Sequence, residues 1–152
     1  MLLTDLLTPE RIKIPLRSHT KDELLGELVD VIGNSPVVRD RDEVLRAVRD
    51  REEVLSTGIG NGVAIPHGKS ASITELALAA GVTPHGIDFE ALDGQPVSLF
   101  FLLVGPESAA GQHVKALSRV SRLLRRDSFR VRLMKAATPE EFYEILSEAE
   151  AS

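Results

Sequence analysis

The chain has 152 residues, no cysteine, no tryptophan, four histidines and a formal net charge of −5 at pH 7. This length suits one domain with its own hydrophobic core, and we expect a single domain over residues 1–152. The missing cysteine excludes disulfide scaffolds, cysteine-ligated zinc, iron–sulfur clusters and thiol nucleophiles. The acidic net charge does not favour a nucleic-acid binder, and no apolar run is long enough to cross a bilayer. The N-terminus does not resemble a secretory signal, so we expect a soluble cytoplasmic protein.

The first third of the chain predicts a short strand followed by two helices. Residues 11–16 alternate between polar and apolar side chains, which is typical of an edge strand, here ended by Pro15. Residues 20–23 indicate a capping box, and apolar side chains at helical spacing follow it until Gly33. Residues 40–43 form a second start signal, so we expect another helix that runs to about Val54.

The middle of the chain predicts strands. Residues 56–68 hold four of the eleven glycines, and this density excludes a helix. Residues 76–82 and 97–104 are apolar runs of strand length, separated by a turn near Asp93 and Gly94. The second run is almost uniformly apolar, so we expect a central strand that is covered on both faces.

The last third of the chain predicts helices again. Apolar side chains form one stripe between residues 114 and 124 and a shorter one between 129 and 134. Thr138, Pro139 and Glu141 are typical of a helix start, and apolar positions follow them. We therefore expect an α/β fold, a single layered domain with a mixed sheet of about five strands flanked by helices on both faces.

The glycine-rich segment does not match the common nucleotide-binding motifs. A P-loop that ends at Gly68, Lys69 and Ser70 needs a glycine at position 63, where the chain has Val63. A dinucleotide fingerprint that begins at Gly58 needs a glycine at that same position. Both nucleotide interpretations therefore fail.

The same segment presents His67 at the end of a short strand-like stretch, residues 63–66. Glycines on both sides let the backbone approach a ligand and leave N–H groups free for an anion. Ser56 and Thr57 add hydroxyl donors, and Arg51 lies just upstream. A histidine in this setting can accept a phosphoryl group or act as a general base. Alternatively, it only satisfies a backbone carbonyl in a turn-rich connection.

His113 is the second candidate. At about 100° per residue, Leu117, Val120 and Leu124 point within about 40° of His113, so this histidine continues the apolar stripe into the first helical turn. The free N–H groups of a first turn favour anions. Alternatively, His113 covers the edge of the core with one hydrogen-bond partner. We expect His19 and His85 in solvated loops.

Other chemistries find little support. The chain has no His-Glu-x-x-His pair, and scattered histidines are weak evidence for zinc. It has no Gly-x-Ser-x-Gly elbow, which disfavours a serine hydrolase. We therefore expect neither a metal nor a cofactor.

The charge is unevenly distributed. Residues 115–135 hold eight of the eighteen basic residues and a single acid. Spacings of four, three and four place four of these residues on one helix face: Lys115, Arg119, Arg122 and Arg126. This face is either simply solvated or a docking surface that steers an acidic partner.

Residues 51–69 carry a resemblance to a known family. Their sequence, REEVLSTGIGNGVAIPHGK, closely resembles the signature of the fructose/mannitol-type enzyme IIA domain of the bacterial phosphotransferase system. Within that family it is most similar to the stand-alone nitrogen-regulatory form. The resemblance extends over nearly the whole chain, through the apolar segment 99–104 to His113 and Leu117.

The resemblance implies a phosphotransferase component in which His67 receives a phosphoryl group from the phosphohistidine of a small histidine phosphocarrier protein. His113 would stabilise the transferring phosphate, and Arg51 would supply positive charge to its oxygens. The phosphate cradle would consist of Ser56, Thr57, Gly58, Gly60 and Gly62. Such a transfer depends mainly on positioning and charge, and we identify no Mg²⁺ site for it.

The resemblance leaves the biological role open. The chain shows no IIB or membrane IIC segment, which favours the regulatory form, where the phosphorylation state of His67 alters binding to target proteins. The alternative is a separate IIA subunit of a fructose/mannitol-type transporter that passes phosphate to a IIB protein. An alternative of another class is an unphosphorylated binding module that docks through the surface at residues 115–135.

Overall fold

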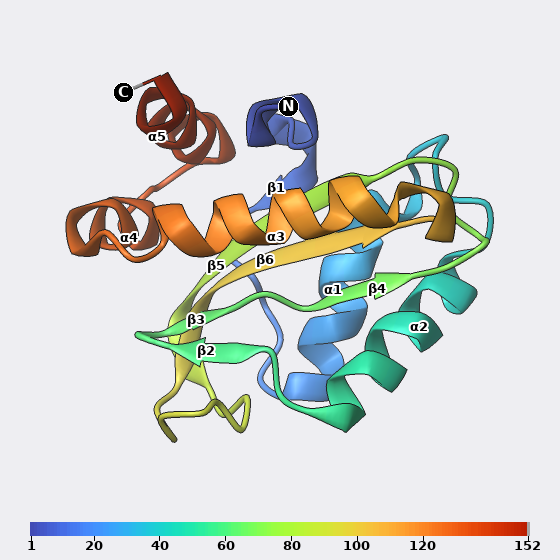
Figure 1. Cartoon of the computed structure of the whole chain (residues 1–152). Coiled ribbons are helices and arrows are strands. Elements are labelled where there is room, and N and C mark those ends of the chain that lie inside the picture. Colours follow the sequence, from blue (N-terminus) through green and yellow to red (C-terminus); the bar gives the residue numbers. More distant parts are fainter. Residues whose placement is uncertain (152) are drawn as a thin grey trace.

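The computed structural model describes residues 1–151 and shows a mixed sheet between two layers of helices (Figure 1). The strands follow the order β1 (Ile12–Lys13), β5 (Ala77–Ile87), β6 (Val97–Gly105), β3 (Val63–Ala64) and β2 (Gly58–Gly60), and β4 (His67–Lys69) also pairs with β6. β5 runs antiparallel to β6, whereas β3 and β4 run parallel to it. The predicted mixed sheet is confirmed, with six strands in the described part of the chain where about five were expected.

Helices cover both faces of this sheet, as predicted. One face is covered by α1 (Lys21–Gly33) and α2 (Arg41–Val54), and the other by α3 (Ala110–Leu123), α4 (Asp127–Met134) and α5 (Pro139–Ala151) (Figure 1). Short 3-10 helices lie at Leu3–Asp5, Pro9–Arg11 and Glu107–Ala109. The domain expected over residues 1–152 ends on Ser152, which lies outside the described residues. Among residues 1–151, no helix has both the length and the apolar character needed to cross a membrane.

The central strand β6 divides the core into two clusters. Successive side chains of a strand point to opposite faces, so β6 supplies both clusters. Leu99, Phe101 and Leu103 belong to the cluster under α3, α4 and α5, and Phe100 and Leu102 belong to the cluster under α1 and α2. All five side chains are buried, which confirms the prediction of a central strand covered on both faces.

Local side-chain bonds explain where three helices begin. The Thr20 hydroxyl accepts a hydrogen bond from the N–H of Glu23 at 3.2 Å, ahead of α1. The Asp40 carboxylate accepts from the first backbone N–H groups of α2, and the Thr138 hydroxyl accepts at 3.1 Å from the N–H of Glu141 in α5. These bonds satisfy the N–H groups of the first helical turn, which have no partner inside the helix. The capping residues in the sequence were therefore sufficient to predict where these helices begin.

Two segments differ from the sequence-based expectation. His85 was expected in a solvated loop at a turn over residues 83–86. It is exposed, but these residues, which include Pro84 and Gly86, lie inside β5. The pairing of β5 with β6 is irregular between Val82 and Ile87, and such a bulge accommodates proline. In the glycine-rich segment, the sequence predicts only a short strand-like stretch at residues 63–66, whereas the structure has an antiparallel β2–β3 hairpin. Its tip has positive φ angles of 95°, 59° and 77° at Gly60, Asn61 and Gly62.

Candidate functional site

His67 begins strand β4, whose backbone pairs with the end of β6 opposite Leu103. Strand alternation directs His67 to the face covered by α3 and Gly68 to the face covered by α2. A Cβ atom at Gly68 would lie 3.1 Å from the backbone nitrogen of Val48 and 3.2 Å from the carbonyl carbon of Ala47. Gly68 therefore allows α2 to pack directly against the strand that carries His67.

His113 lies beside His67, although 46 positions separate them in the sequence. The two ring centroids are 5.8 Å apart and the ring planes meet at 65°. His113 belongs to the first turn of α3 and is 3% exposed, whereas His67 is half-buried and opens toward solvent. The Nδ1 atom of His113 is buried and has no hydrogen-bond partner among the described residues. An unpaired buried nitrogen carries a free-energy cost, which makes pure packing an incomplete explanation of this residue.

One hydrogen bond determines the tautomer of His67. Its Nδ1 atom lies 2.9 Å from the carbonyl oxygen of Ile65. A carbonyl oxygen can only accept, so Nδ1 carries the proton and Nε2 keeps its lone pair. The alternative interpretation of the sequence, a histidine that satisfies a backbone carbonyl, therefore describes one ring nitrogen and leaves the other available as a nucleophile.

The surroundings keep both imidazoles neutral at pH 7. Burial lowers the pKa of His67, and Arg51 and Lys69 lower it further, while the bond to Ile65 and the charge of Glu52 act in the opposite direction. Burial, with smaller contributions from His67 and Lys69, lowers the pKa of His113 to about 4. A neutral His67 has a free lone pair, and the nearby cations favour an incoming anion.

Arg51 belongs to the last turn of α2. Its guanidinium donates a hydrogen bond to the carbonyl oxygen of Leu55 at 2.8 Å, and its charge acts on His67. Lys69 contributes a second cation that the sequence analysis did not select. The missed signal was the period of two in a strand, which places Lys69 on the same side of β4 as His67. The structure thus places His67 against His113 and within reach of the charges of Arg51 and Lys69.

The residues expected to form a phosphate cradle lie in different places and do not form one cluster around His67. The Ser56 hydroxyl donates to the carbonyl oxygen of Phe89 at 3.0 Å, and the buried Thr57 hydroxyl donates to Glu52, so protein acceptors already occupy both protons. Gly58 packs against Ala91, where a Cβ atom would lie only 2.7 Å from that side chain.

Gly60 and Gly62 lie at the tip of the β2–β3 hairpin. Next to this tip, β3 pairs with Leu99 and Phe100, whereas His67 pairs with Leu103. The separation along β6 is roughly 13 Å at about 3.3 Å per residue. The structure therefore does not bring these two glycines to His67.

The basic face of α3 is only partly free. Arg119 donates from Nε to Glu150 at 2.6 Å, and that buried carboxylate also accepts from the N–H groups of Leu3 and Thr4. Arg119 therefore links α3, α5 and the N-terminal 3-10 helix. Arg126 lies beyond the end of α3 as the residue before α4, and it is exposed like Lys115 and Arg122.

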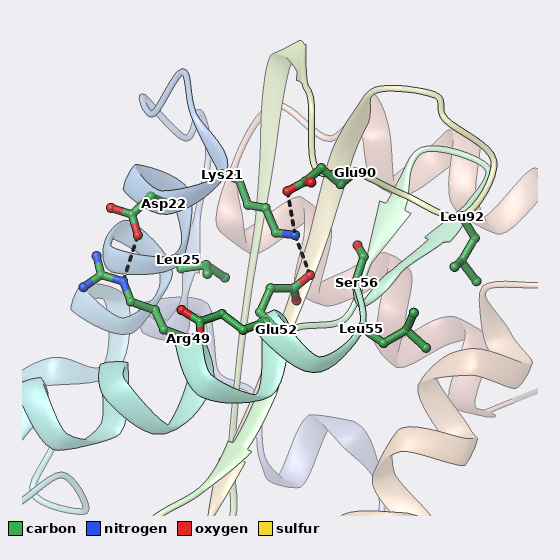
Figure 2. A pocket seen from close by; sticks show the side chains of 10 residues that line it. Lys21, Asp22, Leu25, Arg49, Glu52, Leu55, Ser56, Glu90 and Leu92 are labelled. Carbon is green, nitrogen blue, oxygen red and sulfur yellow. Dashed lines mark ion pairs between the residues drawn. The ribbon is translucent and has the colours of Figure 1, made fainter.

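A cavity of about 500 Å³ lies on the side of α2 that faces α1 (Figure 2). Its wall contains Lys21, whose ammonium group points between the carboxylates of Glu52 and Glu90 (Figure 2). Arg49 pairs there with Asp22 at 3.0 Å. His67 and His113 are not among the residues that line this cavity.

Comparisons with known proteins agree with this architecture. The family described as "Phosphoenolpyruvate-dependent sugar phosphotransferase system, EIIA 2" matches residues 5–149. The chain is 39% identical over 148 residues to the fructose-specific EIIABC component of Bacillus subtilis (strain 168), which covers 97% of this chain but only 23% of that longer protein. It is 37% identical over 147 residues to a nitrogen regulatory protein of Bradyrhizobium diazoefficiens, covering 97% of this chain and 95% of that one. The crystal structure of nitrogen regulatory protein IIA-Ntr from Neisseria meningitidis has a TM-score of 0.87 and 33% identity, covering 95% of this chain and 98% of that one.

Proposed function

The chain belongs to the EIIA 2 family of the phosphoenolpyruvate-dependent sugar phosphotransferase system, and from this premise we propose that its phosphocarrier residue is His67. The donor would be the phosphohistidine of a small histidine phosphocarrier protein. The observation that carries this proposal is the hydrogen bond from Nδ1 of His67 to the carbonyl oxygen of Ile65, because it leaves Nε2 as a neutral nucleophile beside His113. Since phosphoenolpyruvate is an intracellular metabolite, we place this reaction in the cytoplasm.

The transfer itself needs few groups. The Nε2 lone pair of His67 attacks the phosphorus atom, a new N–P bond forms, and the N–P bond to the donor histidine breaks. The electron pair of the broken bond returns to the donor imidazole. The phosphorylated ring gains positive character at Nδ1–H, which the Ile65 carbonyl oxygen stabilises.

The neighbouring residues supply charge and a hydrogen-bond donor. Arg51 and Lys69 offset the negative charge of the phosphoryl oxygens, since both cations act on the position of His67. His113 is neutral and can donate one ring N–H to a phosphoryl oxygen. These groups are held by α2, β4 and α3, so the site exists before a donor arrives.

We further propose that the phosphorylation state of His67 regulates target proteins. Support comes from the nitrogen regulatory relative, which the chain matches over almost its whole length. The second candidate is a IIA subunit that passes its phosphoryl group to a IIB protein, and the similarity to a fructose-specific component favours it.

The test is phosphorylation by purified components. We expect the chain to gain one acid-labile, base-stable phosphate when it is incubated with phosphoenolpyruvate, enzyme I and the histidine phosphocarrier protein. His67→Ala abolishes this signal, whereas His85→Ala, which changes an exposed histidine, retains it. NMR of the product should place phosphorus on Nε2. A wild-type chain that takes up no phosphate would refute the proposal and favour an unphosphorylated binding module.

A further inference from the structure

A buried carboxylate follows Arg51 in the last turn of α2. Glu52 is 5% exposed, and its Oε2 atom accepts from the N–H of Thr57 at 2.9 Å and from the ammonium group of Lys21 at 2.9 Å. Its other oxygen accepts from the Thr57 hydroxyl. Figure 2 shows the ammonium group of Lys21 between Glu52 and Glu90, with the latter at 3.5 Å.

We propose that Glu52 is a positioning residue that sets the equilibrium of phosphoryl transfer to His67. Its buried negative charge disfavours the phosphorylated state of His67, and Lys21 determines how much of that charge is neutralised. The inference rests on the proposed function, because it concerns the phosphorylated state of His67. Glu52 touches neither the histidine ring nor the incoming phosphate and acts through the electric field at the ring.

The hydrogen bonds alone do not require a charge at this position. A glutamine can accept from the Thr57 N–H with its carbonyl oxygen and donate to the Thr57 hydroxyl with its amide, so it preserves both contacts. A buried carboxylate instead carries a desolvation cost that a neutral amide largely avoids. The two contacts with Thr57 therefore do not require the charge of Glu52, whose local counter-ion is Lys21.

Lys21 compensates this charge only in part. Its ammonium group is shared between Glu52 and Glu90 and lies 4.8 Å above the ring of Phe89. Its side chain is 20% exposed, so solvent also reaches it.

Glu52 is connected to the histidine by a chain of hydrogen bonds. It accepts from the N–H of Thr57, the Thr57 carbonyl oxygen accepts at 3.0 Å from the N–H of Ile65, and the Ile65 carbonyl oxygen lies 2.9 Å from Nδ1 of His67. The part of the Glu52 charge that Lys21 leaves uncompensated therefore acts on the ring of His67.

The charged and titratable groups that face His67 come from three elements. They are Arg51 and Glu52 of α2, Lys69 of β4 and His113 of α3. Arg51 and Lys69 attract a phosphoryl group, and Glu52 opposes them. A carrier must release its phosphate as well as accept it, so an opposing charge keeps the phosphorylated state from becoming a trap.

The sign of the effect separates this role from simple structural support. Glu52→Gln removes the opposing charge, so it should shift phosphoryl exchange with the donor toward the phosphorylated chain by about two- to tenfold. Lys21→Met exposes the full charge of Glu52 and should shift the exchange in the opposite direction. Structural damage would disfavour phosphorylation in both variants.

The experiment measures two quantities on wild type, Glu52→Gln, Lys21→Met and the matched control Glu53→Gln, which changes an exposed carboxylate in the same turn. The first is the equilibrium constant of phosphoryl exchange with the donor protein, followed by ³¹P NMR. The second is the titration midpoint of the His67 ring in the unphosphorylated chain, followed by ¹H–¹⁵N NMR. Glu52→Gln should lower this midpoint and Lys21→Met should raise it, while the control changes neither quantity.

Unchanged values in both variants, or shifts of the same sign, would overturn the inference. If the wild-type chain takes up no phosphate, the proposed function fails, and the ring titration still decides whether Glu52 and Lys21 set the field at His67. Far-UV circular dichroism verifies that each variant is folded. If Glu52→Gln does not fold, Glu90→Gln decides the question, because it changes an exposed carboxylate and leaves Lys21 to Glu52 alone. It should favour the phosphorylated chain and lower the ring midpoint, which is the opposite of structural damage, and the reverse shift would overturn the inference.

Discussion

The low pKa of His113 makes the stability of the fold depend on pH in a defined window. The folded chain binds a proton on His113 only near pH 4, whereas the unfolded chain binds it near the ordinary value of 6.5. The unfolded state therefore holds more protons between these two values, and acidification favours it. We predict full stability above about pH 6.5 and a progressive loss between that pH and about pH 4.

The size of this loss follows from the two proton affinities. Lowering the pKa of His113 from 6.5 to about 4 corresponds to a loss of ~3 kcal/mol in the free energy of unfolding once the pH has fallen below both values. The reason is that each tenfold change in proton affinity is worth about 1.4 kcal/mol. At pH 4.5 most of it, ~2.5 kcal/mol, is already lost. The effect is this large because His113 is 3% exposed and buried against the sheet, where solvent cannot hydrate an imidazolium.

The assay is urea unfolding of wild type and His113→Gln at pH 7 and pH 4.5. Because the chain has no tryptophan, far-UV circular dichroism is the appropriate signal. The variant should lose about 2 to 3 kcal/mol less stability than wild type between the two pH values. His85→Gln serves as the control and should retain the wild-type pH dependence. Equal losses in wild type and His113→Gln would refute the reasoning.

Two carboxylates that each accept several hydrogen bonds provide further tests by denaturant unfolding. Burial alone would raise the pKa of Glu27, but bonds from Lys13, the Ser18 hydroxyl and two backbone N–H groups lower it to about 2. The stability that Glu27 contributes is present above about pH 4.5 and is lost toward pH 2. Glu27→Gln should therefore lower the free energy of unfolding by about 2 to 3 kcal/mol at pH 7 and reduce its pH dependence between pH 4.5 and pH 2. An unchanged pH dependence in this range would contradict the prediction. Arg119→Met should cost about 3 kcal/mol, because it leaves the Glu150 carboxylate buried without its cation; a cost below about 0.5 kcal/mol, the size typical of surface positions, would show that the link is not structural.

Helix boundaries were predictable because they depend on local bonds. The caps at Thr20, Asp40 and Thr138 act within three residues of their own positions, so the sequence alone contains the relevant information. The turn expected at residues 83–86 was wrong because pairing with β6 on both sides of it overrides the local signal of proline and glycine. Such pairing depends on residues that are distant in the sequence.

The histidines were predictable individually, but their contact was not. His67 stands out by its glycine-rich surroundings and His113 by its place on an apolar stripe, whereas their 5.8 Å separation results from the pairing of β4 with β6 and the packing of α3. The hydroxyls of Ser56 and Thr57 looked available in the sequence because their acceptors, the Phe89 carbonyl and Glu52, are identified only by the fold.

The positions of both imidazoles depend on the end of strand β6. Strand β4 pairs with the last residues of β6, and the chain leaves β6 at Gly105 and enters α3 at Ala110, only a few residues before His113. Displacements of the outer helices α4 and α5 relative to the sheet therefore leave the separation of the two rings unchanged. Substitutions in the distant core, such as at Phe142, should reduce the population of folded molecules without reducing the competence of each folded molecule.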